Sequence, residues 1–190
     1  MNATSLSETV GRPHPQSASF AWAPLDRSRL RLITQEQATQ FDEQGFFLYK
    51  NAFAPADIAE ITAAIDPLEE AQERRVREQG GSLRISQADA ITFTIHLVRH
   101  SPEARAFTQH PVLKELCREL IGDDVRLYWD QSVYKKSGKP QEFPWHQDNG
   151  YTFTLPQQYI TFWIPLVDVD EENGCPWIAP GRHLRGTLEH

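Results

Sequence analysis

The second half of the sequence most strongly limits the folds open to this chain, because it consists of short β-type runs separated by turn residues. Runs rich in β-branched and aromatic residues predict strands at 125–134, 143–148, 159–167 and 175–179. Residues that tolerate positive φ lie at or near the ends of these runs, at Asn149-Gly150, Asn173-Gly174 and Pro180-Gly181. Closely spaced strands of this kind predict a sheet or a barrel.

The first half of the sequence has mainly helical signals. Thr34 as a cap, Gln37 three residues later and the terminating Gly45 predict a short helix over 34–45. Pro55 begins a second predicted helix that reaches about residue 77, and Pro67 is expected to interrupt it. Further helices are predicted after residue 101 and over 111–121, and strands over 46–50 and 90–97.

These signals predict a single α+β domain over residues 31–190. Residues 1–30 have no sustained hydrophobic period, which indicates a flexible N-terminal extension, although Phe20, Trp22 and Leu25 could lie against the domain. The charged run 69–78 is interpreted as a solvated helix face. In the strand at 159–167, the side carrying Phe162 and Ile164 is expected to be buried.

Charge and composition narrow the possible partners. With 19 basic and 26 acidic residues the net charge is −7, which argues against nucleic acid or an anionic membrane surface as the main partner. No apolar run is long enough to span a membrane and the N-terminus does not resemble a signal peptide, so a cytoplasmic protein is expected. Cys117 and Cys175 are interpreted as two free thiols.

The stretch at 144–151 contains the best candidate for a chemical site. Side chains alternate faces in an extended segment, so His146 and Asp148 should point one way and Trp145 and Gln147 the other. An imidazole and a carboxylate presented together suit a divalent metal, and one more histidine would complete the ligand set of non-haem Fe(II) oxygenases. The same pair could also belong to a zinc hydrolase with a metal-bound water. The motif alone is short and matches by chance at an appreciable rate.

Three blocks, considered together, are much more specific than this motif. They are the segment 41–47 (FDEQGFF), the segment 134–151 with its WHQDNGY end, and the segment 161–183 with TFWIPL, DVDEENG and PGRH. In order and spacing they resemble the phytanoyl-CoA dioxygenase family of Fe(II)- and 2-oxoglutarate-dependent oxygenases. The resemblance implies a double-stranded β-helix of the jelly-roll or cupin-like kind, with helices at its N-terminal side.

The resemblance also implies roles for individual residues. His146 and Asp148 would be two of three iron ligands, with Gln147 and Trp163 near the 2-oxoglutarate co-substrate and Lys136 as a wall of its pocket. From the residues alone, Trp163 could equally be a core aromatic and Lys136 a solvated loop lysine. The expected reaction is hydroxylation of a small molecule by O₂, with release of succinate and CO₂.

The family pattern continues beyond what this sequence offers. In the family a second histidine ligand and an arginine that pairs with 2-oxoglutarate lie several strands after the His-x-Asp block, so we expect this chain to be truncated at its C-terminus. His183 or His190 could substitute as the third ligand, and His96, His100 and His110 are interpreted as surface or locally hydrogen-bonded residues. An alternative function is a non-catalytic β-helix module with an incomplete metal site.

Overall fold

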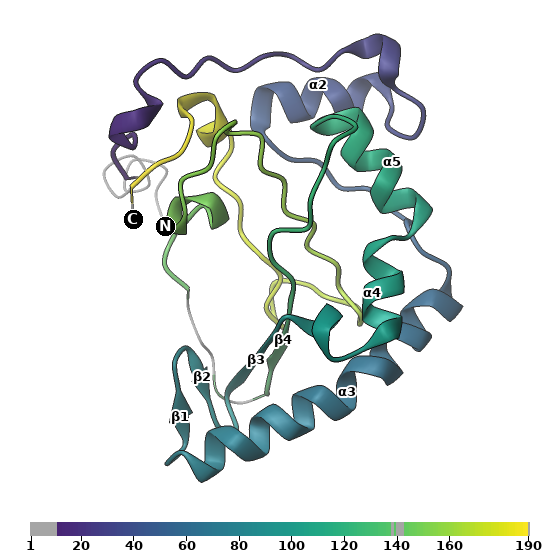
Figure 1. Ribbon diagram of the computed structural model, residues 1–190, viewed down its shortest axis with the longest axis vertical. Coiled ribbons are helices and arrows are strands. Elements are labelled where there is room, and N and C mark those ends of the chain that lie inside the picture. Colours follow the sequence, from purple (N-terminus) through teal and green to yellow (C-terminus); the bar gives the residue numbers. More distant parts are fainter. Residues whose placement is uncertain (1–10, 138, 140–142, 190) are drawn as a thin grey trace.

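The computed structural model describes residues 11–137, 139 and 143–189 and has an α+β architecture (Figure 1). Its helices are α2 (Gln35–Gln44), α3 (Pro55–Glu78), α4 (Pro102–Thr108) and α5 (Pro111–Leu120). Its strands are β1 (Ser82–Leu83), β2 (Ser86–Gln87), β3 (Ile91–Ile95) and β4 (Gln131–Lys135). Short 3-10 helices are η1 (Pro15–Ser17), η2 (Arg27–Arg29), η3 (Leu97–Arg99), η4 (Asp148–Tyr151) and η5 (Arg182–Arg185).

Helix α2 forms where its capping residues predict it. The Thr34 side chain accepts a hydrogen bond from the Gln37 backbone, and the Gln37 side chain accepts one from the Thr34 backbone, so two otherwise unpaired donors are satisfied. Gly45 ends the helix in the left-handed region with φ 87°. The ring of His183 packs directly on this glycine, and a Cβ atom there would lie 2.4 Å from His183 Nδ1. Gly45 is therefore required both by the helix end and by the close packing of η5.

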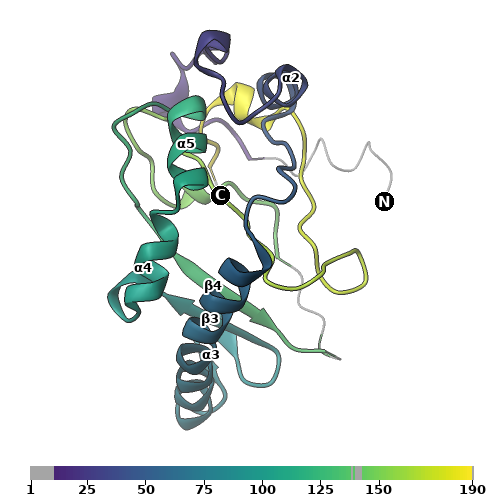
Figure 2. The ribbon, with the colours of Figure 1, turned by 90° about the vertical axis from the view of Figure 1, so that its right-hand side faces the viewer.

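Helix α3 runs without a break through Pro67, so the predicted interruption there is wrong. A proline inside a helix removes one hydrogen bond and costs about 3 kcal/mol. Packing offsets this loss, because α3 contacts β1, β3 and β4 and buries Ile61, Ile65 and Val76 (Figures 1 and 2). The tertiary contacts therefore outweigh the local signal.

The charged part of α3 is not a fully solvated face, because Glu69 and Glu73 are buried against the sheet. Glu69 Oε1 lies 2.7 Å from Lys136 Nζ, and Glu73 Oε2 accepts a 2.6 Å hydrogen bond from the Thr92 hydroxyl. Burial alone would raise the pKa of Glu73, but hydrogen bonds from Thr92, the Asp89 backbone and Arg77 outweigh it and lower this pKa. Polar contacts thus join the helix to the sheet in addition to its apolar packing.

The sheet is antiparallel and open, with strand order β1-β2-β3-β4. In the main pair β3 and β4, Ile91 lies opposite Lys135 and Ile95 opposite Gln131. The strand predicted at 90–97 is therefore confirmed, while only the last part of the one predicted at 125–134 forms a ladder. Within the described residues, the predicted strands at 46–50, 143–148, 159–167 and 175–179 form no ladder. They run as extended or irregular segments because a β-strand needs a hydrogen-bonded neighbour.

The segment 159–167 still has the alternation of a strand, although it lacks ladder hydrogen bonds. Ile160, Phe162, Ile164 and Leu166 are partly buried, and the residues between them are exposed. The first two pack against a core cluster formed by Ile33 and residues of α2 and α5, and Leu166 packs against a second cluster formed by Leu97 and residues of α3 and α4. The members of the two clusters are Ile33, Ala38, Leu116 and Leu120, and Ile61, Ile65, Leu97 and Ala104. The predicted inward side is thus correct, but its burial is only partial.

Described residues before position 31 contact the domain. The Asp42 carboxylate of α2 accepts hydrogen bonds from Trp22 Nε1 and the Leu25 backbone, and it lies 2.8 Å from Arg27 Nη2. The expected contacts of Trp22 and Leu25 are therefore present. The flexibility of the N-terminal extension and the domain boundary near residue 30 stay predictions.

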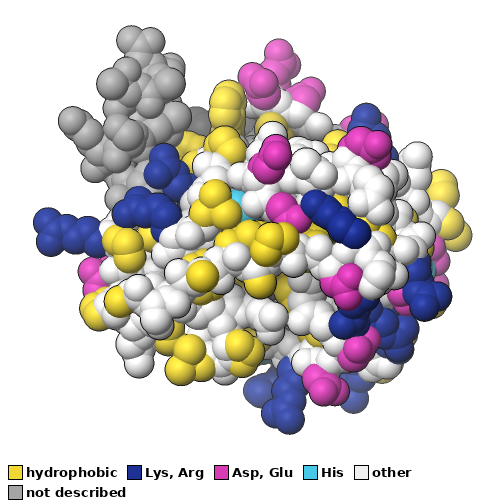
Figure 3. Space-filling view, turned by 90° about the horizontal axis from the view of Figure 1, so that it is seen from above, with side chains coloured by type: hydrophobic (Ala, Val, Ile, Leu, Met, Phe, Trp, Pro, Cys, Tyr) yellow, Lys and Arg dark blue, Asp and Glu magenta, His cyan; other side chains and the backbone are white. Residues whose placement is uncertain are grey.

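Other sequence-based expectations concern the surface and the thiols. No helix among the described residues is long and apolar enough to cross a membrane. Cys117 and Cys175 are both free, as expected. Acidic, basic and hydrophobic side chains are intermixed on the end of the molecule near α2 (Figure 3).

The partial burial of the segment 159–167 gives a stability prediction. Phe162→Ala should lower the free energy of unfolding by about 2–3 kcal/mol, less than the roughly 3–5 kcal/mol of a fully buried phenylalanine. Val167→Ala, on the exposed side of the same segment, should change it by no more than about 0.5 kcal/mol. Urea unfolding of both variants measures these values, and equal losses would contradict the alternation.

Candidate metal site

His146 and Asp148 come together on one side of the chain. Gln147 between them is extended, with φ −110° and ψ 137°, and η4 begins at Asp148. As a result, His146 Nε2 lies 3.4 Å from Asp148 Oδ1. Both side chains are partly accessible, with 33% and 43% of their surfaces exposed. The geometry predicted from the alternation of an extended segment is therefore present.

A hydrogen bond orients each of these two side chains. In both cases it involves the polar atom that does not face the other side chain. His146 Nδ1 lies 2.8 Å from the Pro144 carbonyl oxygen, and a carbonyl can only accept, so Nδ1 carries the proton. In the neutral ring the lone pair is then on Nε2, the atom next to Asp148. The Thr161 hydroxyl donates a 2.7 Å hydrogen bond to Asp148 Oδ2, which leaves Oδ1 on the side of the imidazole. Such outer contacts are the usual means of aiming metal ligands.

The distance between the two donor atoms suits a shared cation. Ligand atoms about 2.1 Å from one metal lie about 3.0 Å apart at a right angle and about 3.4 Å apart at the tetrahedral angle. The observed 3.4 Å is within this range. One nitrogen and one carboxylate oxygen are also a donor set that borderline divalent metals accept. His146 and Asp148 therefore fit two positions of a metal site.

A third protein ligand does not join them in the part of the chain that the structure describes. No group of three His, Cys, Asp or Glu side chains there is arranged to hold a metal. His183, a possible substitute, lies instead against α2, where its Nε2 is 3.0 Å from the Asp42 carbonyl oxygen and its ring contacts Trp22. His190, the other possible substitute, lies outside the described residues.

Gln147 points to the other side, where its contacts are with the segment 186–188. Its Nε2 donates to the Gly186 carbonyl at 3.2 Å, and its Oε1 accepts from the Leu188 backbone at 2.7 Å. Asn149 follows the same direction and donates to the Thr187 hydroxyl at 2.8 Å. These contacts fix the back of the His146–Asp148 segment to another part of the chain.

The two remaining candidates lie in different surroundings. Lys136 forms its ion pair with the buried Glu69 of α3 and lies 5.8 Å from the ring centroid of Tyr134. Trp163 is 51% exposed and therefore is not the core aromatic considered from its sequence context. It shares the exposed side of its segment with Thr161, the residue that contacts Asp148.

The other histidines have local roles. His110 caps α5 by accepting a hydrogen bond from the Val112 backbone, and its Nε2 lies 3.8 Å from Asp57 Oδ2. The ring of His96 contacts that of Trp129, with centroids 4.6 Å apart. His100 is exposed. This agrees with their interpretation as surface or locally bonded residues.

Sequence reasoning missed two residues beside the carboxylate. Thr161 holds Asp148 directly, and Tyr159 is near enough that the Asp148 charge adds to the effect of burial in raising the pKa of the Tyr159 hydroxyl. The ring of Tyr128 packs against Tyr159 at a centroid distance of 5.8 Å. The alternation of 159–167 could have shown that Tyr159 and Thr161 share a side, but not that this side faces residue 148.

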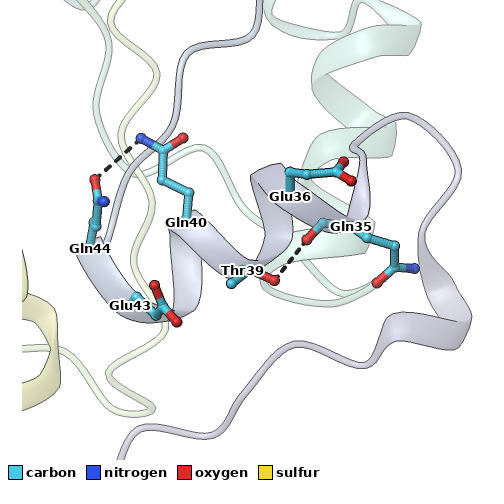
Figure 4. A pocket seen from close by; sticks show the side chains of 6 residues that line it. All are labelled: Gln35, Glu36, Thr39, Gln40, Glu43 and Gln44. Atoms are coloured by element: carbon cyan, nitrogen blue, oxygen red, sulfur yellow. Dashed lines mark hydrogen bonds between the residues drawn. The ribbon is translucent and has the colours of Figure 1, made fainter.

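Two surface hollows are separate from these residues. One of about 360 Å³ runs along α2 and is lined by amide, hydroxyl and carboxylate side chains, some bonded to neighbours in the same helix (Figure 4). Another of about 230 Å³ is lined by Phe46, Glu171, Cys175, Pro176, Trp177 and Ile178. Neither includes a predicted ligand, so the chemistry of the donor pair and not the size of a hollow identifies the candidate site.

Comparison with known proteins matches one family model and several curated relatives. The family model described as Phytanoyl-CoA dioxygenase (PhyH) matches residues 41–190. Ectoine dioxygenase of Bordetella bronchiseptica is 25% identical over 160 residues, which are 80% of this chain and 50% of that protein. Phytanoyl-CoA dioxygenase domain-containing protein 1 of Mus musculus is 28% identical over 117 residues, 60% of this chain and 40% of that protein.

A shorter match is closer in sequence. Phytanoyl-CoA dioxygenase of Arabidopsis thaliana is 41% identical over 56 residues, covering 30% of this chain and 20% of that protein. The chain thus spans about half the length, or less, of these curated relatives. No solved structure matches it significantly.

The ion pair of Lys136 gives a prediction that separates a structural role from a role at a co-substrate. Lys136→Met leaves the buried Glu69 without its charged partner and should lower the free energy of unfolding by about 1–3 kcal/mol at pH 7. Lys114→Met on the exposed side of α5 is the control, with a change within about 0.5 kcal/mol. Unchanged stability combined with weaker 2-oxoglutarate binding would instead favour the pocket role.

Proposed function

Because the chain belongs to the phytanoyl-CoA dioxygenase family, we propose that it acts in an Fe(II)- and 2-oxoglutarate-dependent oxygenase whose metal is held by His146 and Asp148. The observation that carries the proposal is the convergence of His146 Nε2 and Asp148 Oδ1 at 3.4 Å. Each donor is already aimed by a partner, Pro144 for the imidazole and Thr161 for the carboxylate. The proposed fold is a double-stranded β-helix, of which the open sheet would be one part.

The reaction we propose is hydroxylation of a small molecule with O₂, in which 2-oxoglutarate is converted to succinate and CO₂. Bound Fe(II) would supply the oxidising chemistry needed for an unactivated C–H bond. The protein residues would hold and orient: His146 and Asp148 act as ligands and neither as acid nor as base. Trp163, with its exposed ring on the side of Thr161, is the proposed neighbour of the co-substrate. Gln147 and Lys136 are proposed there as well, although both have contacts elsewhere.

The substrate is proposed only as a class. The relatives carry the names ectoine dioxygenase and phytanoyl-CoA dioxygenase, and these two names point to different substrates. The net charge of −7 weakly disfavours a strongly anionic substrate. We therefore propose a small organic molecule that has an accessible aliphatic C–H bond and is not strongly anionic.

A second candidate function follows from the donor set. Within the described residues no third His, Cys, Asp or Glu side chain joins His146 and Asp148, and this observation supports a binding module with a weak metal site as the alternative. The two functions differ in one product. Succinate formed from 2-oxoglutarate in the presence of Fe(II) and O₂ favours the oxygenase, and tight ligand binding without succinate favours the module.

Metal titration tests the proposed ligands. Anaerobic calorimetry should show one Fe(II) bound per chain, and His146→Ala or Asp148→Ala should abolish that binding, because a single remaining ligand cannot hold the ion. His100→Ala, which removes an exposed histidine, should bind Fe(II) like the parent protein. Retained binding in His146→Ala would rule out the proposed site.

Thr161 provides a finer test of the same site. Thr161→Val keeps the shape of the side chain but removes its hydrogen bond to Asp148 Oδ2, and Fe(II) affinity should fall about 10- to 100-fold, as for other outer contacts of metal ligands. Thr161→Ser retains a hydroxyl and should retain most of the affinity. If both variants bind equally, Thr161 does not orient the carboxylate.

A further inference from the structure

The segment 11–17, which precedes the family match at 41–190, pairs with the end of the described chain. Pro13 and Leu188 form an antiparallel bridge, the His14 backbone donates to the Thr187 carbonyl at 2.8 Å, and the Glu189 backbone donates to the Arg12 carbonyl at 2.7 Å. Figure 1 shows η1 beside this part of the chain. A Cβ atom on Gly11 would lie 2.0 Å from the Glu189 carbonyl oxygen, so this approach requires glycine.

Thr187 is the centre of this contact and is only 1% exposed. Its backbone N–H and its hydroxyl both donate to Gln157 Oε1, each at 2.9 Å. The Ser17 hydroxyl of η1 lies 3.1 Å from the Thr187 carbonyl oxygen and 3.2 Å from Gln157 Oε1. Ser17 is also buried, so water does not readily replace these bonds.

The same residue reaches the back of the candidate metal site. The Thr187 hydroxyl accepts the hydrogen bond of Asn149, while its neighbours Gly186 and Leu188 bond the two ends of the Gln147 side-chain amide. The segment 11–17 also makes a direct contact just after η4. The ring of His14 stacks on that of Phe153, with centroids 4.4 Å apart and an interplanar angle of 20°. Gln147 and Asn149 are therefore anchored to the segment 186–188, while His146 and Asp148 meet each other and stay partly exposed.

We propose that the segment 11–17 acts through Thr187 as a positioning element for the His146–Asp148 pair. A hydroxyl is required at residue 187, because it donates to Gln157 and accepts from Asn149 at the same time, and an alkyl group can do neither. The claim that this positioning serves metal binding rests on the proposed function. The claim that it holds the segment 146–149 rests on the contacts alone.

Hydrogen–deuterium exchange of the metal-free protein tests the mechanical part. In Thr187→Val, a peptide spanning residues 145–153 should exchange about tenfold faster, since local opening controls amide exchange. Gly11→Ala and Ser17→Ala should increase exchange of the same peptide, and Thr187→Ser and the exposed Ser19→Ala should not. Unchanged exchange in Gly11→Ala and Ser17→Ala would overturn the proposal, even if Thr187→Val proves too unstable to measure.

Binding of Co(II), a spectroscopic substitute for Fe(II), tests the connection to the site. Thr187→Val should raise the dissociation constant about tenfold, within the range typical of outer contacts to metal ligands, and Thr187→Ser should restore it. Ile65→Val, which loses stability in the α3–α4 core, should bind Co(II) normally. If Ile65→Val weakens binding as much as Thr187→Val, the effect is general instability and the positioning role is wrong.

The two measurements separate the possible failures. If the parent protein binds no Co(II), the proposed metal function fails, and the exchange data still decide whether the segment 11–17 holds residues 146–149. If Co(II) binds through His146 but Gly11→Ala and Thr187→Val leave both affinity and exchange unchanged, the metal function stands and the positioning role is overturned.

Discussion

The candidate site depends on one backbone constraint, the extended conformation of Gln147. Because this residue is extended, His146 and Asp148 share one side and Gln147 points to the other. A helical turn at the same place would send the two donors in different directions. The contacts of Gln147 with Gly186 and Leu188 stabilise the extended form, so the side chain between the two candidate ligands helps to set the geometry of the site.

The sequence predicted the parts of this structure that depend on local rules. The capping box of α2, its glycine end and the meeting of His146 with Asp148 all follow from residues within three positions of one another. Features set by distant partners were not predictable in this way. Pro67 is tolerated because α3 packs on the sheet, and several strand-like runs form no ladder because no neighbouring segment pairs with them among the described residues.

The same distinction applies within the site. Thr161 contacts Asp148 from 13 residues away, and Thr187 contacts Asn149 from 38 residues away, and neither has a motif that identifies it. The family resemblance indicated His146 and Asp148 as candidate metal ligands, because short motifs record chemistry, but the residues that orient these two side chains are polar side chains of common types. Only the folded chain shows which threonine faces which carboxylate or amide.

The buried carboxylates of α3 have a consequence for how the molecule is assembled. The buried Glu69 pairs with Lys136 just after β4 and the buried Glu73 accepts a hydrogen bond from Thr92 on β3, while the partly buried Asp66 accepts one from Tyr134 of β4. A shift of one helical turn would separate the two buried carboxylates from these partners and leave them without hydrogen bonds. The helix therefore has a single axial position, and the chain that leaves β4 toward residues 143–151 starts from a fixed point.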